Sequence, residues 1–267
     1  MLFNNLGRRI PSEECRVFNP SDNTFYKLNQ PPIDYEQQLR KSAQLGLVTD
    51  ACSYESFKGI CENIYQWIDG TPQWKNLTLG PSIPFTLHIP DLEKDEGSQL
   101  SERFLPLIKS ECSKRPVGEF RATIQGNNKL EGSFSVDPNT NYQRFISQSR
   151  KGRVTGLYFP CAFQEYDISS QRRQLSRITS EAPFQLCVSG HIEISYSLSL
   201  YPELLFDSRY YSPILCASPL VHHDSRMIPI FKSYGPHTEF WLMSQMLTPS
   251  TTQVSEQWSG GLTIYDF

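Results

Sequence analysis

The feature that most constrains the fold is an alternation of apolar and polar residues over residues 184–200. Its apolar positions are Phe184, Leu186, Val188, Ile192, Ile194, Tyr196, Leu198 and Leu200. A period of two is typical of a β-strand with one buried face. Gly190 lies in the middle of the run, where it predicts a bulge or a bend. We therefore expect two strands, or one strongly curved strand, in an antiparallel sheet.

The next clearest pattern is that of an amphipathic helix over residues 53–69. Its apolar residues recur three and four positions apart, and they are Phe57, Ile60, Cys61, Ile64, Trp67 and Ile68. Ser53 is a good N-cap, and Glu55 lies in the first turn, where the helix dipole favours an acid. Gly70 and the proline that follows at position 72 predict the end of the helix.

Shorter patterns complete the fold class. Residues 34–45 predict a short helix that Asp34 caps and Gly46 ends, and residues 153–163 predict another strand. Sixteen Phe, thirteen Tyr and four Trp provide enough apolar area for a sizeable core. We therefore expect an α+β protein in which a curved antiparallel β-sheet packs against a few helices.

The N-terminal part of the chain has the composition of a flexible arm. Residues 1–33 contain prolines at positions 11, 20, 31 and 32 and show no sustained periodicity. The remaining residues, 34–267, are few enough to share one core. We expect them to form one globular α+β domain, with residues 205–267 as a candidate separate extension.

The charge and the cysteines restrict the class of function. The formal net charge of −3 argues against a general polyanion binder. The seven cysteines show no C-x-x-C spacing, so neither a zinc ribbon nor a redox motif is indicated, and scattered thiols suit a reducing compartment. The N-terminus lacks the apolar region of a signal peptide, and no apolar run approaches the roughly 18 residues that span a bilayer. The expected location is the cytosol or a compartment derived from it.

The sequence contains no recognised catalytic motif. G-x-S-x-G, H-E-x-x-H, P-loop and G-x-G-x-x-G patterns are all missing. His191 and Glu193 fall on the polar side of the alternating run, where we expect a surface pair. His222-His223-Asp224 is the densest titratable group and leaves a metal-dependent hydrolase as an alternative. We expect a protein that is not an enzyme, with no catalytic residue, no metal site and no cofactor.

One segment, residues 144–177, is strongly basic. It holds seven cations against the two acids Glu165 and Asp167, a local charge of about +5 (7 − 2). The cations are Arg144, Arg150, Lys151, Arg153, Arg172, Arg173 and Arg177. Because aromatic residues lie between them, the segment is a candidate surface for anionic lipid headgroups or for RNA in a nucleocapsid. A set of solvated loop charges is the alternative.

Pro31, Pro32 and Tyr35 form a second candidate binding motif. With Ile33 and Asp34 they resemble the P-P-x-Y ligand of WW domains, but one residue too many separates the prolines from the tyrosine. A proline pair that leads into the following helix is the alternative interpretation.

Three stretches, in this order, resemble the matrix proteins of rhabdoviruses, particularly the vesiculovirus type. Residues 54–70 are similar to the long helix with a tryptophan near its end that opens their globular domain. Residues 152–160 are similar to their G-R-A-Y-L-P stretch, and residues 183–198 to their P-F-x-x-x-x-x-G-x-I-E-L-x-M-x-I strand pair. The lysine-rich N-terminus of that family is missing, and this chain is longer at its C-terminus.

The resemblance implies an assembly function. It implies an antiparallel sheet packed against two or more helices, in a protein that self-associates, binds the inner face of anionic membranes and condenses the nucleocapsid. The implied partners are further copies of the chain, anionic membrane surfaces, viral nucleocapsid or RNA, and host trafficking proteins. The implied locations are the host cytoplasm, the inner face of cellular membranes and the virion. The alternative is a β-rich viral movement or silencing-suppressor type protein that binds nucleic acid.

Overall fold

The computed structural model describes residues 1–18, 25–115, 119–123, 129–178, 182–206, 209–235, 237–248, 251–252 and 254–267. Its α-helices are α1 (Tyr35–Gln44), α2 (Tyr54–Gly70), α3 (Glu96–Ser98), α4 (Leu105–Ser113), α5 (Tyr142–Lys151), α6 (Ile168–Arg172) and α7 (His191–Leu200). Shorter helical segments are η1 (Lys75–Leu79), η2 (Gln99–Phe104), η3 (Pro138–Thr140) and η4 (Leu175–Arg177).

The strands form one large sheet and two small ones. They are β1 (Ile83–Leu87), β2 (Phe120–Thr123), β3 (Phe134–Val136), β4 (Val154–Gln164), β5 (Gln185–Val188), β6 (Ile214–Cys216), β7 (Leu220–His222), β8 (Met227–Tyr234), β9 (His237–Ser244), β10 (Met246–Thr248), β11 (Thr251–Thr252) and β12 (Trp258–Asp266). The large sheet has eight strands in the order β1-β4-β12-β6-β8-β9-β2, with β5 also paired to β12. The molecule is therefore an α+β protein, which confirms the predicted class.

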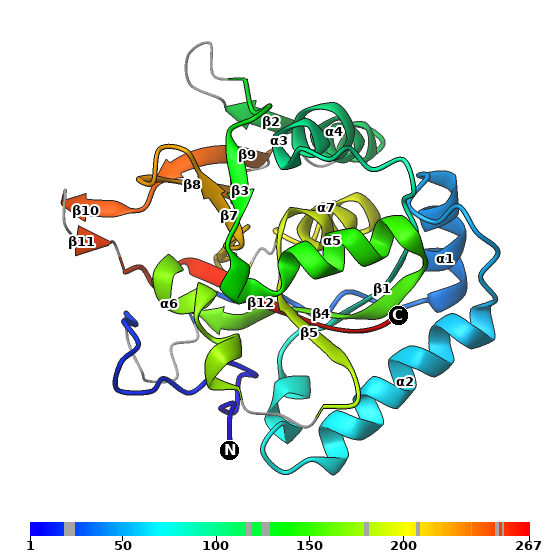
Figure 1. Cartoon of the computed structure of the whole chain (residues 1–267), viewed down its shortest axis with the longest axis horizontal. Helices are drawn as coiled ribbons and strands as arrows, with labels where there is room; N and C mark the ends of the chain where they lie inside the picture. The colour runs from blue at the N-terminus through cyan, green and yellow to red at the C-terminus, as the bar shows by residue number, and fades with distance from the viewer. Residues whose placement is uncertain are drawn as a thin grey trace.

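The sequence predicts an antiparallel sheet, but the large sheet is mixed. Strand β12 runs parallel to β6, and β2 runs parallel to β9. The other pairs of the large sheet, such as β1 with β4 and β8 with β9, are antiparallel. The sheet curves around α7, which has β4 and β12 on one side and α4 with β9 on another (Figure 1). Helix α2 lies below the sheet and packs against β4.

The structure contradicts one prediction about the alternating run. Residues 185–188 form strand β5, but residues 191–200 form helix α7, not a second strand or half of a strand pair. All ten residues of α7 are buried, so the helix has no solvent-facing polar side that could produce a helical period. Three of its polar positions are serines, whose small side chains are easily enclosed; Ser197, for example, donates to the carbonyl oxygen of Glu193 at 2.8 Å. A helix buried on all sides cannot be recognised by periodicity alone.

The two predicted N-terminal helices are confirmed. Helix α1 begins after Asp34, whose carboxylate accepts a hydrogen bond from the backbone N–H of Gln37. Helix α2 begins after Ser53, whose hydroxyl accepts from the backbone N–H of Ser56. The apolar side of α2 is buried, and Trp67 is half-buried against neighbouring aromatic rings.

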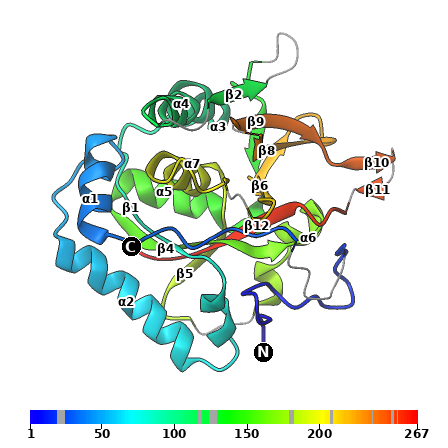
Figure 2. The same cartoon turned by 180° about the vertical axis from the view of Figure 1, so that it is seen from behind.

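Both ends of the chain pack onto this body. Phe3 is buried with its ring 5.5 Å from that of Trp74. Residues 25–33 run across the back of the sheet (Figure 2), where the side-chain amide of Gln30 donates to the carbonyl oxygen of Ser82 at 2.8 Å. The flexibility of residues 1–33 stays a prediction. Residues 205–267 supply strands β6 to β12, and β12 lies between β4 and β6 within the large sheet.

Candidate functional site

Most cations of the basic segment lie in helices, in α5, α6 and η4, while Arg153 and Arg173 lie just after α5 and α6. Arg150 and Lys151 form the last turn of α5, and Arg172 ends α6. Arg150 donates to the carbonyl oxygens of Leu92 and Glu93. The guanidinium of Arg150 therefore holds neighbouring backbone in place.

Two further arginines of the segment also bond within the protein. Arg153 donates to the carbonyl oxygen of Ala51 at 2.7 Å and lies 3.6 Å from the carboxylate of Asp50. Arg177 forms an ion pair of 2.7 Å with Glu14. Both arginines connect parts of the chain that lie far apart in sequence.

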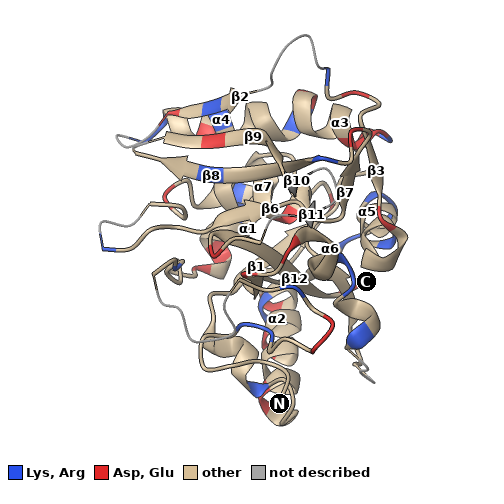
Figure 3. Ribbon diagram, turned by 90° about the vertical axis from the view of Figure 1, so that its left-hand side faces the viewer, with Lys and Arg blue, Asp and Glu red and all other residues tan. Residues whose placement is uncertain are grey.

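Arg172 is half-buried and also bonds to backbone. It donates to the carbonyl oxygens of Ser218 at 2.6 Å and Leu220 at 2.8 Å, and burial lowers the pKa of its guanidinium. The exposed cations of the segment are Arg144, Lys151 and Arg173. Basic and acidic residues are interspersed along the ribbon in Figure 3. Membrane or nucleocapsid binding by the segment stays a prediction, with these three residues as its surface.

The proline motif leads directly into a helix. Pro31 is buried, Pro32 is exposed and Tyr35 is the first residue of α1. The Tyr35 ring packs edge-on against Phe57, with 5.2 Å between ring centroids, and burial raises the pKa of its hydroxyl. In this conformation the tyrosine belongs to the packing between α1 and α2. A role of the motif in peptide recognition stays a prediction.

His222 lies at the end of β7, where its imidazole is used for local structure. Its Nδ1 accepts from the backbone N–H of Asp224 at 3.1 Å, and its ring packs against Phe134. Burial lowers the pKa of this imidazole. Throughout the described ranges, no three His, Cys, Asp or Glu side chains are grouped as metal ligands would be.

His191 and Glu193 do not form the expected surface pair. Residues 191–200 are helical, so the predicted alternation of strand faces does not apply. Both side chains are fully buried at the start of α7. Glu193 accepts from the hydroxyls of Thr263 at 2.7 Å and Tyr142 at 3.0 Å, and burial raises its pKa to about 7. Burial lowers the pKa of His191 to about 3. This polar cluster is enclosed by the core, so it has a structural role.

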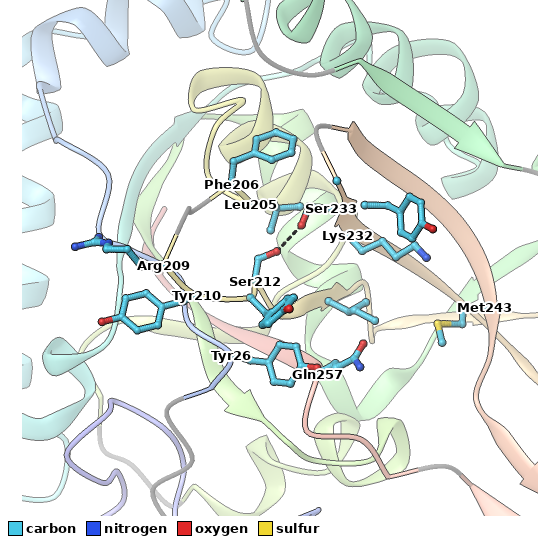
Figure 4. Close-up of a pocket in the computed structure, with 14 residues that line it drawn as sticks. Tyr26, Leu205, Phe206, Arg209, Tyr210, Ser212, Lys232, Ser233, Met243 and Gln257 are labelled. Atoms are coloured by element: carbon cyan, nitrogen blue, oxygen red, sulfur yellow. Dashed lines mark hydrogen bonds between the residues drawn. The ribbon is translucent and has the colours of Figure 1, made fainter.

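A cavity of about 1090 Å³ opens on another part of the molecule, and we call it the aromatic groove (Figure 4). Its walls come from segments far apart in sequence: the N-terminal segment, the chain before β6, the end of β8, β9 and the chain before β12. The lining residues are Tyr26, Leu205, Phe206, Arg209, Tyr210, Tyr211, Ser212, Ile214, Lys232, Ser233, Tyr234, Gly235, Met243 and Gln257. The N-terminal wall is fixed by a backbone hydrogen bond from Lys27 to Tyr211 at 2.9 Å.

Exposed aromatic rings are the main feature of the groove. Tyr211 and Tyr234 are 65% and 70% exposed. Phe25, at the edge of the groove, stacks on Tyr211 with 5.0 Å between centroids and 26° between planes. Large side chains left exposed together in this way mark an interaction surface more often than a chance arrangement.

Cations stand beside these rings. Lys27 and Arg209 lie 4.9 Å and 5.5 Å from the Tyr210 ring centroid. Lys232 lies 5.8 Å from the Tyr234 ring and forms an ion pair of 3.8 Å with Glu239. The described lining contains no His, Cys, Asp or Glu side chain. The groove therefore suits a ligand with flat rings and negative charge, and it offers hydroxyl and amide groups for hydrogen bonds.

No pattern in the sequence predicts this groove. The pair Tyr210-Tyr211 next to Arg209 was the only local signal, and it lies in the part of the chain without clear periodicity. Tyr26 had been assigned to an arm, because nothing local shows that residue 26 pairs with residue 211.

Comparison with protein-family models, with curated proteins and with solved structures found no match. The resemblance to rhabdovirus matrix proteins therefore stays an expectation. None of the described helices combines the length and the apolar character needed to cross a bilayer.

Proposed function

We propose that the protein binds single-stranded nucleic acid through the aromatic groove. The observation that carries the proposal is the set of exposed tyrosines with cations beside them around one cavity. Proteins that bind single strands stack bases on aromatic side chains and track the phosphates with basic ones. The function is non-enzymatic, and it corresponds to the nucleic-acid-binding alternative from the sequence.

Shape and charge favour a single strand over a duplex. In a duplex the faces of the bases are covered by their neighbours, so exposed rings such as Tyr211 and Tyr234 find no partner. The cavity volume of about 1090 Å³ lies just above the roughly 300–1,000 Å³ typical of small-molecule pockets, so more than one base fits. If Lys27, Arg209 and Lys232 each contact one phosphate, the slope of log K against log salt is about −2.

The first prediction tests the rings. Tyr211→Ala and Tyr234→Ala should each weaken binding of a fluorescent single-stranded RNA by at least about fivefold, because one base stacked on an aromatic ring contributes about 1–3 kcal/mol. Fluorescence anisotropy at low and moderate salt measures both the affinity and the salt slope. The variants should keep the melting temperature of the wild type, since both side chains are largely exposed.

The matched control is Tyr54→Ala. Tyr54 on α2 is also an exposed tyrosine with a lysine near its ring, Lys58 at 5.8 Å, but it lies outside the groove. It should bind RNA as the wild type does. Equal loss in all three variants, tighter binding to duplex than to single strands, or no binding at low salt would each contradict the proposal.

A matrix-like function is the second candidate, favoured by the exposure of three cations of the basic segment. The variant that tests it changes Arg144, Lys151 and Arg173 to Glu and spares the arginines that bond within the fold. If the candidate holds, the wild type sediments with anionic liposomes at low salt and self-associates, and the triple variant does not sediment. RNA binding by this variant at wild-type strength would assign RNA to the groove alone.

A further inference from the structure

A second cavity, of about 280 Å³, lies where α1 meets the ends of α4 and α7. We call it the cationic pocket. Its lining residues are Gln37, Arg40, Lys41, Gln44, Arg115 and Leu200. Three of the six are cations, two are carboxamides and none is acidic. Such a lining offers hydrogen-bond donors and positive charge together.

The fold holds one of these cations in place. Lys41 donates to the carbonyl oxygen of Leu200 at 3.0 Å and lies 3.4 Å from the carboxylate of Glu111 on α4. Burial lowers the pKa of its ammonium group; Glu111 and the more distant Glu203 oppose this shift, and the positive charge of Arg115 adds to it. Lys41 and Arg115 line the same cavity, so a bound anion would relieve the repulsion between their positive charges.

The charge around the pocket is only partly neutralised. Glu111 is shared between Lys41 and Lys114, and Glu36 pairs with Arg40 at 3.0 Å. Among the described residues, Arg115 forms no ion pair within 4.0 Å. Arg115 therefore brings to the cavity a positive charge that no ion pair of the described residues neutralises, next to the amides of Gln37 and Gln44.

We propose that the cationic pocket binds a phosphomonoester group. A phosphomonoester carries a charge of about −1.5 to −2 and three strong acceptor oxygens, which match several cations and amide donors better than the single charge of a phosphodiester. A water molecule occupies about 30 Å³ of liquid, so a cavity of about 280 Å³ has room for the group and the first atoms of its ester. The pocket shares no lining residue with the aromatic groove.

The experiment titrates the full chain with inorganic phosphate at low salt and follows binding by calorimetry and by phosphorus NMR. We expect saturable binding in the wild type and a loss of about tenfold in Arg115→Gln, since removing one charge-assisted contact changes affinity by about that factor. Arg115→Lys should retain part of the binding. Arg121→Gln is the control, because Arg121 is an exposed, acid-paired arginine on β2 outside the pocket.

Further arms identify the molecule that presents the phosphate. A 5′-phosphorylated oligonucleotide is compared with its 5′-hydroxyl form, and vesicles of phosphatidic acid with vesicles of phosphatidylserine. A preference for either phosphomonoester that Arg115→Gln abolishes supports the proposal. Absence of saturable phosphate binding, or equal binding by wild type, Arg115→Gln and an Arg40→Gln variant, overturns it. Tyr234→Ala should leave phosphate binding unchanged, so the groove and the pocket can fail separately.

Discussion

Glu193 brings a carboxyl group into the core with no basic side chain among its described partners. Its oxygens accept from the hydroxyls of Thr263 and Tyr142 and from the backbone N–H of Gly190. Burial raises its pKa from 4.5 to about 7, and these hydrogen bonds oppose the rise. The sequence could not reveal this environment, because Glu193 has the same neighbours in sequence whether residues 191–200 form a strand or a buried helix.

The raised pKa predicts a pH-dependent stability. In the folded protein Glu193 binds its proton up to about pH 7, whereas in the unfolded chain it releases it near pH 4.5. The contribution of Glu193 to the free energy of unfolding is therefore fully present below pH 4.5. It is lost as the pH rises through 7, by about 3 kcal/mol in total. Urea unfolding of wild type and Glu193→Gln at pH 4.5, 6 and 8 should show the wild type losing stability relative to the variant. Parallel profiles would mean that the buried carboxyl has an ordinary pKa.

Elements with a local signature could be predicted from the sequence. Helices α1 and α2 begin directly after the predicted caps Asp34 and Ser53, because a cap and an amphipathic period depend only on nearby residues. Strand β4 matches the predicted strand to within one residue at each end, because its β-branched and aromatic residues are also a local signal. Helix α7 could not be predicted, because its environment is supplied by β1, α1, η2 and α4.

The start of α7 depends on the absence of a side chain at position 190. A Cβ there would overlap the ring of Tyr142, which is fully buried and cannot move aside easily. We expect Gly190→Ala to destabilise the protein by about 1–3 kcal/mol, as overpacking of a core does. Chemical denaturation measures the change.

Gly59 provides the opposite case within α2. A Cβ at Gly59 meets nothing within 4 Å. Gly59→Ala should therefore stabilise the protein by about 0.5–1 kcal/mol through helix propensity alone. Destabilisation by both substitutions to a similar extent would contradict the steric explanation for Gly190.

At the scale of the whole molecule, the fold depends on contacts between distant parts of the chain. Strand β12, close to the C-terminus, pairs with β4, β5 and β6. The aromatic groove likewise combines Tyr26 with residues 205–206, 209–212 and 232–235. No pattern within a short window reports such pairings, so the α+β class was predictable while the sheet order and the groove were not.

The central place of β12 leads to the last prediction. Trp258, Leu262, Ile264 and Tyr265 are all buried without measurable exposure. Truncating one large core side chain costs about 2–5 kcal/mol, so the loss of four is comparable to the whole 5–15 kcal/mol that stabilises a typical domain. A chain ending at residue 257 should therefore show no cooperative thermal unfolding by circular dichroism. Removing Phe267 alone, which is 55% exposed, should shift the melting temperature by less than about 2 °C. Cooperative unfolding of the truncated chain would contradict this prediction. It would show that residues 1–257 form a hydrophobic core without β12.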